Sequence, residues 1–325
     1  ATGWAVGRDG TILRTQNGGS SWSSQVLSSG QHLNGVSFVS AQSGWLVGNS
    51  GTLARTTDGG TSWTETATGV STDLTSVAFT DATTGSVAGS SGTLLDSDDG
   101  GSSWKEQNGV ISSSRSWSAD TQVTGHVTVA SGATLTIDPG VTVKFDSGKS
   151  LIIDGGLVAQ GNSGNGITFT SSAASPAAGD WAHIIFTDSS IAATVDGNEN
   201  YTGGSILEYV TVEYAGSGGS VGAVETDQSS VFVNQSTIRH NATTGLYVVG
   251  GNKQIISNST FSYNSGDADS GGIYVKSVDA TLSGNTVTYN HKGIHTETDS
   301  ATQIVVENNT ISYNSGSRCL HVAGS

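Results

Sequence analysis

The nonapeptide RTTDGGTSW occupies residues 55–63, and two near-copies of it, RTQNGGSSW (14–22) and DSDDGGSSW (96–104), stand on either side. The tryptophans that end the three copies follow one another at intervals of 41 residues. Each interval holds four short strand-like stretches, for example LNGVSFV (33–39) and GWLVG (44–48), separated by Gly, Ser, Asn and Asp. A repeat of this length with four antiparallel strands predicts the blades of a β-propeller.

The nonapeptide itself predicts a tight hairpin. Its Asp or Asn side chain accepts hydrogen bonds from nearby backbone N–H groups, its glycine pair takes positive φ, and its Trp packs between neighbouring blades. These are structural roles. We assign them to Asn17, Trp22, Asp58, Trp63, Asp99 and Trp104.

This pattern resembles the Asp-box, or BNR repeat, of sialidase-type propellers. Together with the preceding GWAVGRDGTILRT (3–15) and GWLVGNSGTLART (44–56), it is similar to the propellers of the Ycf48 family of photosystem assembly factors. The resemblance covers residues 1–109 and implies that the boxes stabilise the fold away from any catalytic pocket. The arginine triad of the sialidases is not recognisable in this region.

The repeats supply about eleven strands, or about 2.75 four-stranded blades, between residues 1 and 110. A closed ring needs about four blades or more. We therefore expect an incomplete propeller. Its open edges would be completed by flanking residues absent from the sequence or by neighbouring chains.

A second repeat begins after the serine-rich stretch near residue 113. Apolar triplets such as VTV (127–129) and LTI (135–137) recur about every eight residues, and no helical periodicity is present. Four similar hexapeptides end in Asn241, Asn264, Asn290 and Asn314, at intervals of 23, 26 and 24 residues. The pattern predicts stacked coils, with these Asn residues forming an amide ladder at a turn.

The alternation within the hexapeptides places Ile238, Phe261, Val287 and Ile311 in one column, and His240, Tyr263, Tyr289 and Tyr313 in the next. These features resemble the right-handed parallel β-helix of the pectate-lyase-like superfamily. The predicted fold is therefore all-β: a partial β-propeller over residues 1–110, followed by a right-handed parallel β-helix of about nine rungs over residues 111–325. Longer loops are expected within residues 171–205.

Alternation also predicts an outward stripe of rings on successive rungs, formed by Tyr247, Tyr274, His295 and His321. Such a stripe would suit a polysaccharide or a subunit contact. Two alternatives remain open: the residues are simply tolerated on a solvated face, or His295 and His321 share a metal ion.

No catalytic constellation is recognisable. β-Helix lyases and hydrolases gather carboxylates with an Arg or Lys on one sheet, because proton transfer beside a sugar needs charge at close range. We find no such motif, so the sequence predicts no enzyme activity and no cofactor. The remaining option is a Ca²⁺ loop at Asp267 and Asp269 in GDADSGG, for which a solvated loop is the simpler interpretation.

Composition bounds the partners. The 325 residues carry a net charge of −15 with only 12 Lys and Arg, which disfavours nucleic acid and anionic membrane surfaces. No apolar run approaches the roughly 18–20 residues of a membrane span, and the single Cys319 excludes an internal disulfide. Many secreted bacterial proteins share this acidic composition, rich in Ser, Thr, Asn and Gly.

We therefore expect an extracellular or cell-surface structural, adhesive repeat protein that self-associates or joins neighbouring chains in a filament, stalk or adhesin. The alternative is a secreted carbohydrate-binding or carbohydrate-active β-helix protein. An assembly factor is disfavoured, because the β-helix is foreign to the Ycf48 family.

Overall fold

The computed structural model describes residues 1–325 except 69, 71, 91–92, 98, 103, 119, 266–270, 300, 317–318 and 325, and it gives the backbone alone for 105–108 and 322–324. Apart from one 3-10 turn, η1 (Arg8–Gly10), every helix or strand among these residues is a β-strand, which confirms the all-β prediction. No helix in the described part of the chain has the length and apolar character needed to span a bilayer. The chain divides into two compact units, Ala1–Ser113 and Ser114–Ser325.

The first unit contains three antiparallel meanders of three, four and four strands, the first two of which are separate sheets. The first meander contains β1 (Gly3–Val6), β2 (Thr11–Thr15) and β3 (Ser23–Val26); the second β4 (Leu33–Phe38), β5 (Gly44–Gly48), β6 (Leu53–Thr56) and β7 (Thr64–Glu65); and the third β8 (Leu74–Phe79), β9 (Gly85–Gly89), β10 (Leu94–Ser97) and β11 (Lys105–Ile111). Each meander follows chain order, as in a propeller blade. The prediction of a partial propeller is confirmed.

Tryptophans join one blade to the next. Trp45 is fully buried and stacks on Phe79 of the following blade, with ring centroids 3.5 Å apart, and its Nε1–H donates to the carbonyl oxygen of Gly100 at 2.9 Å. Trp4 repeats the stack on Phe38 at 3.6 Å. The boxes supply a second ring: Trp63 and Trp104 meet the same two phenylalanines edge-on at 5.9 and 5.8 Å, whereas Trp22 is 47% exposed.

The three boxes share one hydrogen-bond pattern. In the second box, Oδ1 of Asp58 accepts from the backbone N–H groups of Thr61 and Ser62 at 2.9 Å, and Oδ2 accepts from the Ser62 hydroxyl at 2.6 Å. These hydrogen bonds hold the pKa of Asp58 well below its usual range, and the bond from the Ser62 hydroxyl has the largest effect. Gly59 and Gly60 both have positive φ. Equivalent backbone bonds reach the side chains of Asn17 and Asp99 at 2.9 Å.

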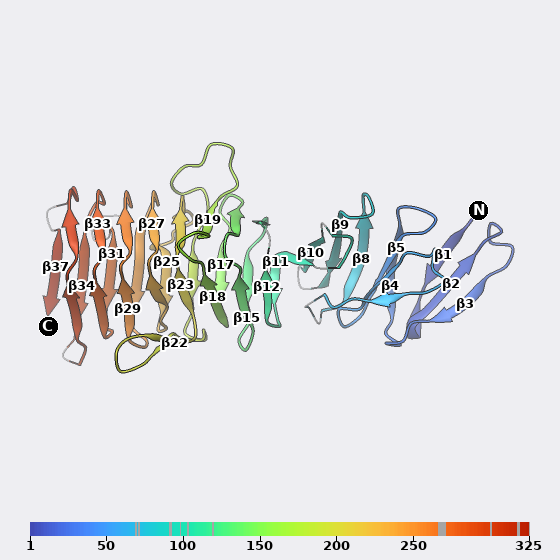
Figure 1. The fold of residues 1–325 in the computed structure, drawn as a ribbon, viewed down its shortest axis with the longest axis horizontal. Helices are drawn as coiled ribbons and strands as arrows, with labels where there is room; N and C mark the ends of the chain where they lie inside the picture. The colour runs from blue at the N-terminus through green and yellow to red at the C-terminus, as the bar shows by residue number, and fades with distance from the viewer. Residues whose placement is uncertain are drawn as a thin grey trace. The chain divides into compact units, whose positions relative to one another are not determined.

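The second unit is a solenoid of three parallel sheets (Figure 1), and residues 114–325 contribute eight described strands to each of them. Sheet 1 contains β14 (Val127–Val129), β17 (Leu151–Ile153), β20 (Ile184–Phe186), β25 (Gly222–Asp227), β28 (Thr244–Val249), β31 (Ile273–Lys276), β34 (Ile294–Thr298) and β37 (Leu320–Gly324). Sheet 2 contains β12 (Arg115–Trp117), β15 (Thr134–Ile137), β18 (Gly156–Gln160), β23 (Ile206–Glu208), β26 (Phe232–Asn234), β29 (Gln254–Ser257), β32 (Ala280–Ser283) and β35 (Ile304–Glu307). Sheet 3 contains β13 (Thr121–Val123), β16 (Thr142–Phe145), β19 (Ile167–Ser171), β24 (Val210–Glu213), β27 (Thr237–Arg239), β30 (Thr260–Ser262), β33 (Thr286–Thr288) and β36 (Thr310–Ser312). The solenoid thus has eight coils among the described residues, whereas the sequence predicted about nine.

The core consists of aligned apolar columns. Ile238, Phe261, Val287 and Ile311 are register neighbours, and the first three are at most 1% exposed. The predicted amide ladder is confirmed. Side-chain amides link Asn241, Asn264, Asn290 and Asn314 in order, at 2.8, 3.0 and 3.1 Å. The longer loops expected within 171–205 are present as two excursions, which flank β20.

Candidate functional site

Each C-terminal coil turns two corners of the same construction. At both, one residue in the left-handed conformation follows a strand, and a buried or half-buried polar residue comes next. The first corner joins sheet 2 to sheet 3, and its left-handed residues are Gln235, Asn258, Gly284 and Asn308, with φ between 48° and 67°. The second follows sheet 3, and its left-handed residues are His240, Tyr263, Tyr289 and Tyr313, with φ between 56° and 59°.

The two corners place different side chains on the same backbone. Positive φ costs a non-glycine residue about 1–3 kcal/mol, and Asn and Gly tolerate it best. Over the four final coils, the first corner uses Asn or Gly three times, whereas the second uses Tyr three times and His once. In the coil before them, Tyr209 and Tyr214 occupy the two corners. The backbone conformation therefore does not require aromatic residues at the second corner. Their presence there has to be explained by what their side chains contact.

These rings form a continuous stack, which we call the aromatic ladder: Tyr214, His240, Tyr263, Tyr289 and Tyr313. The last four rings lie 4.9–5.1 Å apart with interplanar angles of 3–8°, and Tyr214 lies 6.1 Å from His240. The three final tyrosines are 50%, 48% and 74% exposed. Because neighbouring rings cover one another's faces, the ladder presents ring edges and hydroxyl groups to solvent.

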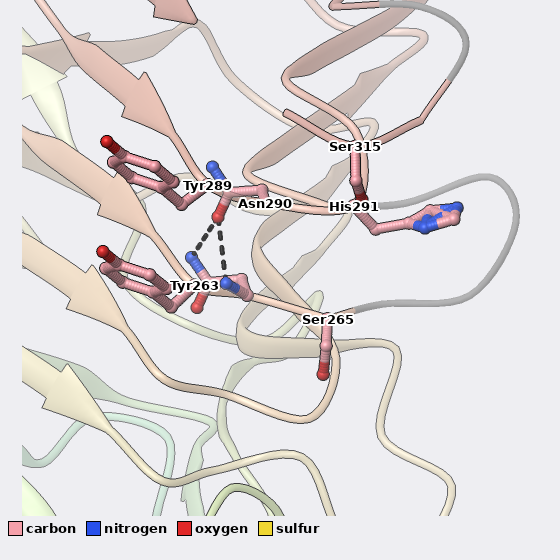
Figure 2. A pocket seen from close by; sticks show the side chains of 7 residues that line it. Tyr263, Ser265, Tyr289, Asn290, His291 and Ser315 are labelled. Atoms are coloured by element: carbon pink, nitrogen blue, oxygen red, sulfur yellow. Dashed lines mark hydrogen bonds between the residues drawn. The ribbon is translucent and has the colours of Figure 1, made fainter. Parts of the chain in front are cut away.

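The amide ladder fixes the backbone behind these rings. Figure 2 shows Tyr263 and Tyr289 pointing the same way, with the bonds from Asn264 to Asn290 beside them. Asn264 and Asn290 are 1% and 2% exposed, so the rings extend from a rigid, fully bonded corner. A shallow hollow of about 350 Å³ lies across the same two coils and is also lined by His291.

A column of seven threonines runs along the strands that precede this corner. Consecutive members are register partners on sheet 3: Thr142, Thr168, Thr211, Thr237, Thr260, Thr286 and Thr310. Each precedes a core residue, so its side chain faces outward. The last two are exposed and the others half-buried. Threonine presents a hydroxyl and a methyl group, and this column adds a regular polar row to the face that leads to the aromatic ladder.

The predicted stripe on sheet 1 does form one register column. Tyr247 pairs with Tyr274, Tyr274 with His295, and His295 with His321. The column is nevertheless not an open platform, because Tyr274 and His295 are only 7% and 5% exposed. Tyr247 stacks on Tyr274 at 4.6 Å, and His295 meets the edge or face of its neighbours at 5.1 and 4.5 Å. The rings mainly contact one another.

Charged groups beside this stripe are paired. Nζ of Lys276 lies 2.9 Å from Oε2 of Glu297, and Oε1 of Glu297 lies 3.5 Å from Nε2 of His295. The hydrogen bond from Lys276, ahead of one from Tyr274, lowers the pKa of Glu297. On the same sheet, Glu225 accepts a hydrogen bond from the backbone of Val221 and lies 2.9 Å from Nδ1 of His183. Both carboxylates are thus held by neighbouring groups of the sheet.

A metal site receives no support from the described side chains, among which no group of three or more His, Cys, Asp or Glu is placed to hold an ion. His295 and His321 lie with ring centroids 4.5 Å apart. The proposed Ca²⁺ ligands Asp267 and Asp269 lie outside the described residues.

Family comparisons divide the chain at the same place as the fold. The model described as photosynthesis system II assembly factor YCF48 matches residues 1–69 and 22–106. The pectate-lyase like beta helix domain matches 109–241, and the right handed beta helix region matches 195–325. No curated protein matches the chain.

Two solved structures are similar to the N-terminal part. "YCF48 bound to D1 peptide" is 27% identical over 33% of this chain and 37% of its own length, with a TM-score of 0.31. "YCF48 from Cyanidioschyzon merolae" is 26% identical over 33% of this chain and 35% of its own, with a TM-score of 0.30. The match thus spans little more than a third of either structure. The chain carries Ycf48-like BNR repeats in its N-terminal third and a right-handed β-helix of the pectate-lyase-like kind in the remainder.

Proposed function

We propose that this chain is an extracellular or cell-surface structural protein with an adhesive role, and that its solenoid binds an extended polysaccharide along the aromatic ladder. The observation that carries the proposal is the difference between the two corners in the four final coils. The chain places large, exposed aromatic side chains where Asn or Gly would relieve backbone strain, as at the other corner.

The spacing of the ladder suits a repeating polymer. Its ring edges recur every 4.9–5.1 Å along the final four coils, a step set by the distance between parallel strands, and the last three rings carry hydroxyl groups. An extended glycan presents a sugar residue at a step of similar length, with hydroxyl groups that can exchange hydrogen bonds with the tyrosine hydroxyls. The threonine column provides a parallel row of hydroxyls beside it.

Ladder variants test the proposal. Replacing Tyr263 and Tyr289 together with Asn removes two stacked rings but relieves strain at two left-handed positions. The double variant loses three stacking contacts, each worth about 0.5–1.5 kcal/mol, and relieves strain at two residues by about 1 kcal/mol each, so folding stability should change by less than about 3 kcal/mol. Polysaccharide retention should fall at least tenfold. The measurement is co-sedimentation of the full chain with insoluble cellulose, insoluble chitin and calcium-gelled pectin, alongside Gln235→Asn as the control at the other corner.

Three results would count against the proposal: no binding to any of these polymers, unchanged binding by the double variant, or an equal loss in Gln235→Asn. Release of reducing ends from a bound polymer would instead support the carbohydrate-active alternative. Self-association stays a prediction, which analytical ultracentrifugation of the purified chain would test.

A further inference from the structure

A second candidate site lies on sheet 2, away from the corner that carries the aromatic ladder. The excursion between β20 and β23, residues 187–205, forms a strap that ends in the hairpin of β21 (Thr194–Val195) and β22 (Tyr201–Gly203) and projects from the solenoid (Figure 1). A hollow of about 360 Å³ lies between the strap and the strand ends of sheet 2. This volume falls at the small end of the roughly 300–1,000 Å³ of ligand sites.

The strap is fixed at its tip. Oδ1 of Asp196 accepts from the backbone N–H groups of Asn198 and Asn200 at 2.8 and 2.9 Å, which closes the hairpin. Glu199 then reaches three coils further along the solenoid. Its carboxylate pairs with Lys253 and accepts a hydrogen bond from the Thr281 hydroxyl at 2.8 Å. The hollow therefore has a preformed wall.

The floor of the hollow is apolar and aromatic. Ile206 and Phe232 are 0% and 7% exposed, and the half-buried ring of Tyr201 lies 5.5 Å from the ring of Phe232 at 50°. The Tyr201 hydroxyl donates to the carbonyl oxygen of Gly204 at 2.7 Å, which fixes the ring against the floor. Burial, together with the negative charge of Glu208, raises the pKa of Tyr201. The phenol thus stays neutral beside a carboxylate.

A row of planar polar groups forms the opposite side. Oε1 of Glu208 accepts from the Asn234 amide at 2.7 Å, and Oε2 accepts from the Gln160 amide at 2.8 Å. Oδ1 of Asn234 accepts in turn from the Asn258 amide at 3.1 Å. Each carboxylate oxygen of Glu208 keeps one lone pair for a further donor. The network holds these acceptors in fixed positions.

We propose that this strap pocket binds a single neutral sugar residue. The apolar C–H face of the sugar would pack on Tyr201, and its hydroxyl groups would donate to Glu208 and exchange hydrogen bonds with the surrounding amides. Two carboxylates line the pocket, at Glu199 and Glu208, and only the former has a cationic partner among the described residues. The pocket therefore disfavours uronate and sulfated sugars. This site does not depend on the ladder.

Saturation-transfer NMR and calorimetry on the full chain test the proposal. The probes are the methyl glycosides of glucose, galactose and N-acetylglucosamine. Galacturonate and lysine methyl ester are the comparison ligands, one anionic and one cationic. At least one neutral glycoside should bind. Glu208→Gln keeps the shape and removes one charge-assisted acceptor, so affinity should fall about tenfold. Tyr201→Ala should abolish binding, whereas Tyr201→Phe retains the ring and should stay within about twofold.

Tyr289→Asn is the matched control and should leave sugar binding unchanged, which separates this proposal from the polymer-binding function of the ladder. The proposal is overturned if none of the three glycosides binds, if galacturonate or the lysine ester binds more tightly than they do, or if Glu208→Gln binds as tightly as the parent. Because Tyr201→Ala can disturb the strap, the Glu208→Gln and Tyr201→Phe pair decides the outcome.

Discussion

Asn264 offers a direct test of the solenoid's interior. Its amide donates to Oδ1 of Asn290 and to the carbonyl oxygen of Ile238, both at 3.0 Å, and its own Oδ1 accepts from Asn241 at 2.8 Å. Replacement with Asp keeps the shape and the acceptor but removes both donated bonds. Oδ1 of Asn290 keeps the bond from the backbone N–H of residue 264, whereas the carbonyl oxygen of Ile238 loses its side-chain donor. An unsatisfied buried acceptor costs about 1–3 kcal/mol, and an uncompensated buried charge about 3–5 kcal/mol. We expect Asn264→Asp to lose about 4 kcal/mol of unfolding free energy at pH 7.

The loss should depend on pH with a defined sign. Burial raises the folded-state pKa of the new carboxyl above its unfolded value of about 3.9. The folded state then binds the proton more tightly than the unfolded state, so the destabilisation is largest at neutral pH and shrinks as pH falls toward about 4.

Thermal unfolding followed by circular dichroism provides the measurement. In a unit of this size, about 1 kcal/mol corresponds to roughly 2–4 °C, so the transition of the solenoid should fall by about 8–16 °C at pH 7. Asn308→Asp, at the exposed first corner, is the control and should shift the transition little. The reasoning is refuted if Asn264→Asp melts within about 2 °C of the parent at pH 7, or if its deficit grows on acidification.

Three further predictions concern other contacts. Because the pKa of Asp58 is lowered in the folded state, its carboxylate contributes stability at pH values above the ordinary Asp pKa of about 3.9, and this stability is lost as the pH falls. Asp58→Asn removes this titrating group, so the acid unfolding of the first unit should become less steep when it is followed by tryptophan fluorescence. Trp45→Ala removes the stack on Phe79 and should cost about 3–5 kcal/mol in urea denaturation. Lys276→Met should raise the pKa of Glu297, measured by NMR titration, while the melting temperature hardly moves; an unchanged pKa would contradict the pairing.

Periodic features of the fold could be predicted because they repeat. The 41-residue interval marks three blades, and the spacing of the asparagines places Asn241, Asn264, Asn290 and Asn314 on one ladder. Tyr214 escapes the same pattern because Ala215, and not Asn, follows it. The ladder's other four aromatic residues were placed in one column by alternation alone.

Features that depend on long-range contacts could not be predicted. The threonine column cannot be recognised in the sequence, because its members do not recur at a constant interval. The two long excursions, for example, separate Thr168 from its register partner Thr211. Alternation identifies Tyr274 and His295 as outward-facing, but it does not reveal that neighbouring rings bury them. The strap pocket requires Glu199 to meet Thr281, and no spacing rule specifies that contact.

In both ladders the described contacts join neighbouring rungs, by hydrogen bonds between the amides and by stacking between the rings, in steps of 23, 26 and 24 residues. A whole coil can therefore be inserted or deleted in a single genetic event, because the coils on either side of the junction present the same corner to each other. Every added coil lengthens the row of tyrosines by one ring. The affinity for a long polymer would then depend on the number of coils, through avidity, while the chemistry of each contact stays the same.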